Sequence, residues 1–255
     1  MFQLLPFWHR CLHYLLPNCC LWCQLPVQQA HQQICDYCNA ALPKLSLTAQ
    51  QDNALLLPAV WRGLAPVRFD RLVALSWYQL PWSYWISQWK FQQDMACGAL
   101  LCQQLQQAAL AYQQQGGTLP DAICYVPISA RRRAERGFNQ AEMLAAELAR
   151  SWNIPLLHLF VRRAGDSHQV GLNRQQRRGN LRREFRLRQA QQCPPHLLLV
   201  DDVITTGATV DQLCRLLKKQ HVRQIDVWTL AITAAQRKRR TKMSPGAISP
   251  SLRRH

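Results

Sequence analysis

Two adjacent carboxylates and three threonines stand close together in the stretch HLLLVDDVITTGATV, residues 196–210. Asp201 and Asp202 follow an apolar run, and the threonines surround Gly207. Backbone N–H groups of a glycine-containing turn at a helix start can bind a phosphate. The carboxylates would repel a phosphate, but they suit vicinal hydroxyls or a divalent cation. A ribose 5-phosphate unit has both kinds of group, so we predict this ligand chemistry; an Asp pair that only caps the next helix is the alternative.

Four cysteines form two CxxC pairs within residues 20–38, and two such pairs place four thiolates around one tetrahedral ion, as in structural Zn²⁺ sites. A redox-active CxxC is the competing interpretation, but such motifs normally stand alone beside a βαβ pattern. Cys19 and His31 are alternative ligands. We expect one structural zinc ion, which would fold a module too small to bury a core, held by Cys20, Cys23, Cys35 and Cys38.

The elements that must position the carboxylates alternate between strand and helix. Apolar runs predict strands at residues 121–127, 156–163, 196–200 and 222–232, and amphipathic patterns predict helices at 138–152 and 210–220. Residues 128–137, ISARRRAERG, are expected to be a loop, and the polar stretch 164–185 is a long functional or mobile one. This alternation predicts a mostly parallel sheet with helices on both faces, whose ligands bind at the carboxyl ends of the strands.

An aromatic segment precedes these elements. Residues 82–117 are expected to form one long helix with a kink near Gly98. Its aromatic residues favour packing against the sheet, with a base-stacking platform as the alternative. Lys90, in the sequence WKF, is the lone basic residue there.

The formal net charge of +17 indicates phosphate-rich partners. All lysine and arginine positions from Arg131 to Arg188 are arginines, whose planar fork suits bidentate phosphate contacts, although solvated helix faces are the plainer explanation. No apolar run reaches the ~18 residues of a membrane span, and the first residues lack the features of a signal peptide. Scattered cysteines fit a reducing compartment. We therefore expect a cytoplasmic protein without a membrane span.

These motifs together resemble a known family. HLLLVDDVITTGAT is similar to the phosphoribosyl pyrophosphate motif of type I phosphoribosyltransferases. The CxxC pairs, the WKF helix, VPISARRRAERGFNQAE and DVWTLAI narrow the resemblance to the ComF/GntX family of competence and DNA-utilisation proteins. It implies a type I phosphoribosyltransferase-like parallel sheet flanked by helices, with a small N-terminal zinc-ribbon-like module. The expected organisation is an extension (1–17), a four-cysteine zinc module (18–45), a linker (46–80), the phosphoribosyltransferase-like domain (81–235) and a basic disordered tail (236–255).

The resemblance also implies roles for residues. Asp201 and Asp202 would contact the ribose hydroxyls and are the first candidates for a catalytic base. Pyrophosphate would lie over residues 127–137, where three arginines are candidates, each of which could also be a solvated loop charge: Arg132, Arg133 and Arg136. Mg²⁺ would come with the ligand, held mainly by its oxygens. The 5′-phosphate would be held by Thr205, Thr206, Gly207, Ala208 and Thr209.

The resemblance implies a function in competence, meaning the uptake and utilisation of extracellular DNA. The domain would bind phosphoribosyl pyrophosphate or a nucleotide. One alternative is an active phosphoribosyltransferase of nucleotide salvage, whose acceptor is open. The other is a basic adaptor that binds single-stranded DNA or a DNA-uptake helicase of the competence machinery.

Overall fold

The computed structural model describes residues 18–27, 29, 32–45, 53–64, 67–162, 184–188 and 192–234. Three predicted segments lie wholly or mostly outside these residues: the extension 1–17, the polar stretch 164–185 and the tail 236–255. None of the described helices has both the length and the apolar character needed to cross a bilayer.

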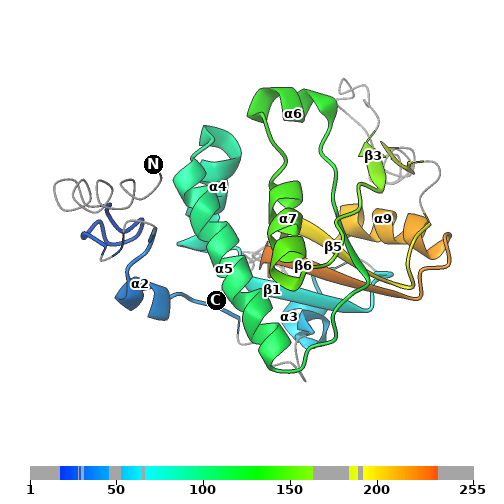
Figure 1. Ribbon diagram of the computed structural model, residues 1–255, viewed down its shortest axis with the longest axis horizontal. Helices are drawn as coiled ribbons and strands as arrows, with labels where there is room; N and C mark the ends of the chain where they lie inside the picture. Colours follow the sequence, from blue (N-terminus) through cyan, green and yellow to red (C-terminus); the bar gives the residue numbers. More distant parts are fainter. Residues whose placement is uncertain are drawn as a thin grey trace, which may run out of the picture.

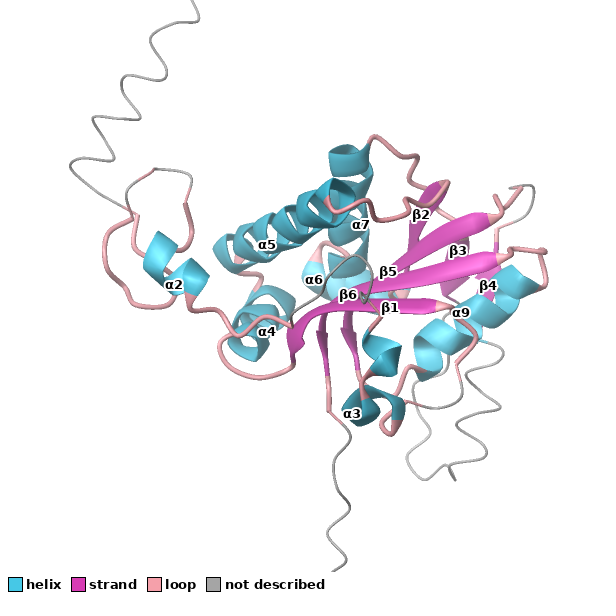
Figure 2. Ribbon diagram, turned by 90° about the horizontal axis from the view of Figure 1, so that it is seen from below, coloured by secondary structure: helices cyan, strands magenta, loops and turns pink. Residues whose placement is uncertain are grey.

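A four-stranded sheet forms the centre of the fold, in the order β1-β6-β5-β2. All neighbouring strands pair in parallel. Helices α5 and α7 lie on one face and α3 and α9 on the other (Figure 2). The predicted parallel sheet flanked by helices is confirmed. The bounds are β1 (Arg71–Trp77), β2 (Ala122–Tyr125), β5 (His196–Ile204), β6 (Gln224–Ile232), α3 (Pro58–Trp61), α5 (Met95–Gln114), α7 (Gln140–Trp152) and α9 (Ala208–Lys218).

The central strands are apolar because helices cover both of their faces. Leu197, Leu198, Leu199 and Val200 of β5 are each at most 1% exposed. Asn139 begins α7, where its side chain accepts a hydrogen bond from the N–H of Ala141. Both β5 and α7 were predicted from the spacing of apolar residues, and the structure contains a strand and a helix at these positions.

The predicted linker 46–80 contains a strand of the sheet. β1 pairs with β6 from Arg71↔Asp226 to Trp77↔Ile232, so the sheet begins ahead of residue 81 and that boundary was wrong. The short run RLVALSW is buried at its five central positions, and it is an edge strand of this sheet because β6 is its one neighbour in the strand order. A short 3-10 helix, η1 (Ala54–Leu56), precedes α3 in the same segment.

The single helix expected over residues 82–117 is two helices, α4 (Trp82–Gln92) and α5. The break is at Gln93, whose φ of 57° is left-handed, and at Asp94, whose carboxylate accepts from the N–H groups of Ala96 and Cys97. The kink expected near Gly98 is therefore at Gln93 and Asp94, and Gly98 lies within α5. A Cβ there would lie 2.5 Å from Nε1 of Trp89, so glycine lets the two helices approach closely.

Two further expectations are corrected. The stretch ISARRRAERG is not a loop, because residues 130–136 form helix α6 (Ala130–Arg136), capped by the hydroxyl of Ser129. The strand expected at 156–163 is divided. Leu156 makes an isolated parallel bridge to Ile123, whereas β3 (Phe160–Arg162) pairs antiparallel with β4 (Phe185–Leu187) in a separate two-stranded sheet.

The N-terminal cysteine-bearing segment includes α2 (Asp36–Ala40) and lies beside α4 and α5 (Figure 1). The indole of Trp85 donates from Nε1 to the carbonyl of Leu21 over 3.4 Å, and its ring meets Trp22 edge-on at 6.2 Å. Asn39 accepts from Nε2 of Gln104 at 2.9 Å. The segment is therefore anchored to both helices.

Candidate functional site

Asp201 and Asp202 lie in the carboxyl-terminal half of β5, because the strand continues to Ile204, four residues beyond the end predicted at Val200. The Asp202 side chain is 10% exposed, and its Oδ2 lies 2.5 Å from Nζ of Lys90 on α4. Its Oδ1 accepts from the N–H of Val203 at 2.8 Å. Asp201 accepts from the N–H of Asp202 at 2.9 Å. The backbone around the pair is held by Thr229 of β6, whose hydroxyl donates to the carbonyl of Asp202.

The surroundings of Asp201 favour the protonated form of its carboxyl. Burial raises the pKa of Asp201 well above its ordinary value, and the charge of Asp202 adds to the rise while Lys90 opposes it. Like charges on neighbouring buried carboxyls disfavour double ionisation. Asp201 can therefore hold a proton in a pH range where an exposed aspartate is ionised.

A cavity of about 140 Å³ opens beside this pair. Four basic side chains line it together with both carboxylates. They come from α4, α6 and β3, so three elements distant in sequence contribute charge to one site. The polar and charged lining residues are Lys90, Arg132, Arg136, Asn139, Gln140, Arg162, Asp201, Asp202 and Thr209.

The predicted arginines separate into two groups. Arg132 and Arg136 line the cavity, and within the described residues neither makes an ion pair with a carboxylate. Burial lowers the pKa of Arg136, and the charge of Arg132 lowers it further. Arg133 instead pairs with Glu142 at 2.9 Å and is not part of the cavity lining. Among the described residues, Arg132 and Arg136 therefore make no ion pair with a carboxylate, although the charges of Asp202 and Glu135 act on Arg136.

The threonine turn leads from β5 into α9. Thr205 and Thr206 are exposed, and Thr209 is the residue of the turn that lines the cavity. Gly207 has φ 70° and caps α9 without a side-chain hydrogen bond, so the first-turn N–H groups lack the usual capping oxygen. Ala208 begins the helix, and its N–H lies 3.5 Å from the hydroxyl of Thr206. Such a helix start can receive an anion.

Sequence reasoning assigned no role to four polar or charged residues of the cavity: Lys90, Asn139, Gln140 and Arg162. Lys90 was noted only as a lone base on an aromatic helix, yet it contacts Asp202. Gln140 is 2% exposed, and its Oε1 accepts from Arg136 at 3.5 Å. Its Nε2 has no acceptor in the described part of the chain, although it is buried. A buried donor without a partner is costly, which suits a ligand oxygen at this position. The sequence signal that could have identified Gln140 is its place in the motif RGFNQAE.

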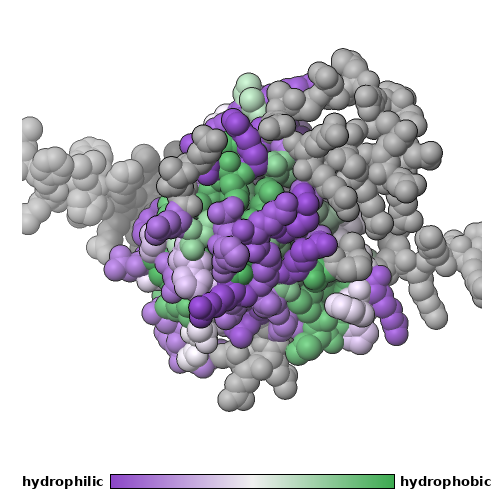
Figure 3. All heavy atoms as spheres, turned by 90° about the vertical axis from the view of Figure 1, so that its right-hand side faces the viewer, coloured by the Kyte–Doolittle hydropathy of each residue, from purple (hydrophilic) through white to green (hydrophobic). Residues whose placement is uncertain are grey.

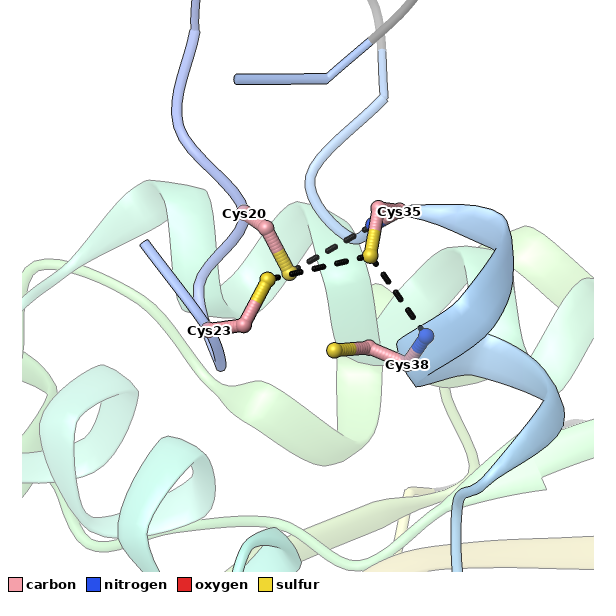
Figure 4. Close-up of side chains that lie close together, drawn as sticks. All are labelled: Cys20, Cys23, Cys35 and Cys38. Carbon is pink, nitrogen blue, oxygen red and sulfur yellow. Dashed lines mark hydrogen bonds between the residues drawn. The ribbon is translucent and has the colours of Figure 1, made fainter. Parts of the chain in front are cut away.

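The four paired cysteines come together at the N-terminal segment. Their Sγ atoms lie within 4.8 Å of one another and point toward a common centre (Figure 4). The Sγ atoms of Cys23 and Cys35 are 3.8 Å apart, close to the spacing of about 3.8 Å that tetrahedral Zn–S bonds require. Burial alone would raise the pKa of Cys20, but N–H groups that include those of Cys35 and Trp22 lower it to about 6. The cluster can hold a metal ion.

Comparison with known proteins identifies the family. A model described as "Phosphoribosyl transferase domain" matches residues 139–246. "DNA utilization protein YhgH" of Salmonella typhimurium is 33% identical over 227 residues, which cover 86% of this chain and 98% of that protein. The chain belongs to the family of these DNA utilization and competence F proteins. "Competence protein F" of Haemophilus influenzae is also 33% identical, over 86% of this chain and 93% of its own length.

"Competence protein ComFC" of Streptococcus pneumoniae is 34% identical over 105 residues, which cover 41% of this chain and 45% of that protein. Among solved structures, a hypoxanthine phosphoribosyltransferase from Staphylococcus aureus is 14% identical, with a TM-score of 0.33, over 52% of this chain and 63% of that chain. The match to the phosphoribosyl transferase domain model and the parallel sheet flanked by helices show that this chain has a type I phosphoribosyltransferase fold, and its N-terminal cysteine cluster is compatible with a zinc module.

Proposed function

We propose that the cavity binds phosphoribosyl pyrophosphate or a nucleotide, and that the protein serves competence through the uptake and utilisation of DNA. One observation carries the binding proposal: Asp201 and Asp202 share a cavity with Arg132 and Arg136, which have no carboxylate partner among the described residues. The role in competence is proposed because relatives at 33% identity are named as competence and DNA utilization proteins.

Each part of such a ligand has a matching group. The ribose hydroxyls can donate to the carboxylates of Asp201 and Asp202. The 5′-phosphate suits the start of α9 near Thr209, where N–H groups and the helix dipole favour an anion. The pyrophosphate suits Arg132 and Arg136, since guanidinium groups bind phosphate oxygens in bidentate fashion.

Two metals accompany this proposal. Mg²⁺ fits the carboxylates only partly, because Asp202 already pairs with Lys90, so ligand oxygens and water would supply most of its coordination. Its chemistry would be to neutralise charge on the leaving pyrophosphate. Zn²⁺ is the metal proposed for the cysteine cluster, since four thiolates in tetrahedral spacing are typical of a closed structural site.

A transferase reaction at this site would displace pyrophosphate from C1 of the ribose by a nitrogen nucleophile. Binding and charge stabilisation would supply most of the acceleration. Asp201 is the proposed proton acceptor, because burial raises its pKa well above the ordinary value. Pyrophosphate release in the presence of a panel of bases distinguishes a transferase from a protein that only binds or senses the ligand.

The binding test is the thermal shift of the protein with phosphoribosyl pyrophosphate and Mg²⁺. Asp202→Ala should abolish the ligand-induced rise in Tm. Arg136→Met should weaken binding at least about tenfold, because a charge-assisted contact is lost. Arg133→Met removes the same charge, but its partner is Glu142 outside the cavity, so it should keep nearly normal affinity. Full stabilisation of Asp202→Ala would contradict the site.

A further inference from the structure

The ion pair between Lys90 and Asp202 joins two elements far apart in sequence. Lys90 lies in the last turn of α4, and Nζ contacts Oδ2 of Asp202 at 2.5 Å with side chains 25% and 10% exposed. The pair lines the cavity that the proposed function assigns to the ligand. Lys90 therefore stands where the ribose hydroxyls would bind.

A bound ligand would change the partners of the Asp202 carboxylate. Its Oδ1 already accepts the N–H of Val203, and Oδ2 holds Lys90. A ligand hydroxyl that donates to Oδ2 competes with the ammonium of Lys90. A half-buried ammonium that loses its anion is costly unless it gains another. On ribose, the substituent at C1 is the neighbour of the 2-hydroxyl, so a phosphate or pyrophosphate at C1 places a new anion beside Lys90.

Buried tryptophans hold helix α4 in place, whereas the stem of the Lys90 side chain can rotate. Trp82, Trp85 and Trp89 on α4 are each at most 1% exposed, and Trp89 stacks on Phe138 at 5.8 Å. Lysine carries a compact charge on a flexible four-carbon stem. A short rotation of this stem can move the charge without moving α4.

We propose that Lys90 determines ligand specificity: it neutralises Asp202 in the free site and transfers its contact to a phosphate oxygen at C1 when ligand binds. The site then selects ribose 5-phosphates that carry a C1 phosphate or pyrophosphate over ribose 5-phosphate itself. This inference rests on the proposed function and adds the group that discriminates within that ligand class. The buried Nε2 of Gln140, which has no acceptor among the described residues, is a second donor in the same cavity and supports an anionic ligand there.

The test measures Kd by isothermal titration for phosphoribosyl pyrophosphate and for ribose 5-phosphate, each with Mg²⁺. Lys90→Met should weaken the first ligand at least about tenfold and the second by less than about threefold, since one charge-assisted contact is lost. Lys90→Arg should restore most of the preference because it retains a cationic donor. Lys218→Met is the matched control: it removes a lysine that pairs with Asp70, outside the cavity lining, and should leave both Kd values within about twofold.

Three results are decisive. Equal weakening of both ligands by Lys90→Met would overturn the inference, because Lys90 would then only hold Asp202 in place. Unchanged affinities would overturn it as well, while leaving the proposed function intact. A wild-type protein that binds neither ligand would overturn the proposed binding of phosphoribosyl pyrophosphate, and the inference about Lys90 with it. Should Lys90→Met fail to fold by circular dichroism, Lys90→Gln is the second variant: its side chain is one atom shorter than lysine, has a polar but uncharged end, and is subject to the same criteria.

Discussion

At the scale of single residues, the site is built on an electrostatic conflict. Asp201 and Asp202 are neighbours in a buried strand, and a single lysine, Lys90, contacts one of them. Natural sites keep such costly groups where a ligand needs them, at the expense of stability. The ligand would relieve the conflict by giving the carboxylates hydroxyl donors and the arginines an anion.

Replacing Asp201, whose pKa is raised by burial, should stabilise the fold in a pH-dependent way. Because burial raises the folded-state pKa of Asp201 above the ordinary 3.8, stability falls as pH rises above that value. Asp201→Asn keeps an oxygen to accept the N–H of Asp202 but carries no charge. We expect Tm at about pH 7.5 to rise by roughly 2–4 °C, the shift of about 1 kcal/mol in a chain of this size. Ligand-induced stabilisation should be lost.

The pH profile separates this effect from general stabilisation. Near pH 3.5, where the aspartate is largely protonated in both states, wild type and Asp201→Asn should melt together within about 1 °C. Asp70→Asn is the control, since Asp70 is 50% exposed and pairs with Lys218 at the surface. It should show no gain at either pH. An equal gain for Asp201→Asn at both pH values would contradict the charge argument.

At the scale of elements, the helices and strands that depend on local sequence patterns could be predicted from the sequence. β5 and α9 follow from an apolar run and a glycine turn within 23 residues, so the motif and its two elements could be placed together. Helix α6 was missed because its arginines suggested a loop, although Ser129 and Gly137 mark its two ends. The contact of Lys90 with Asp202 spans 112 positions, so only the tertiary packing of α4 brings them together.

The turn between β5 and α9 depends on Gly207. Its φ of 70° strains any other residue, and an added Cβ would lie 3.1 Å from Leu64. Gly207→Ala should lower stability by about 1–2 kcal/mol and weaken ribose 5-phosphate binding at least about tenfold. Gly116→Ala is matched, because φ is 80° and no atom lies within 4 Å of the new Cβ. It should lose similar stability but bind normally. Normal binding by Gly207→Ala would argue against the phosphate turn.

At the scale of the whole molecule, the cysteine cluster and the cavity are joined through α4. Trp85 contacts Leu21 and Trp22 in the cysteine-bearing segment, while Lys90 on the same helix reaches the cavity. On the side of the molecule that carries α9, the described surface is mostly hydrophilic with smaller apolar patches (Figure 3). The segment with the cluster buries few residues of its own, and we expect its fold to depend on the metal.

Metal removal tests that dependence. The purified protein should contain about one Zn²⁺ per chain, as expected for one Cys₄ site. Cys35→Ser should lose the metal and lower Tm, because the fold of this segment is expected to depend on the metal, whereas a serine at this position can still cap α2. Cys102→Ser, outside the cluster, is the control and should retain zinc. Elemental analysis and thermal melting measure both effects, and full zinc content in Cys35→Ser would contradict the assigned ligands.

The net charge of +17 leads us to predict salt-dependent binding of single-stranded DNA by the whole chain. A protein that binds single-stranded DNA through phosphate contacts releases counterions, so its affinity should fall steeply as salt rises. Residues 236–255 contain seven lysines and arginines, and a chain ending at residue 235 should bind more weakly with a shallower salt dependence. Fluorescence anisotropy with a labelled oligonucleotide at several salt concentrations measures both. Phosphoribosyl pyrophosphate binding serves as the control, since the truncation leaves every cavity residue in place. An affinity indifferent to salt and to the truncation would exclude a DNA-binding adaptor that acts through charge.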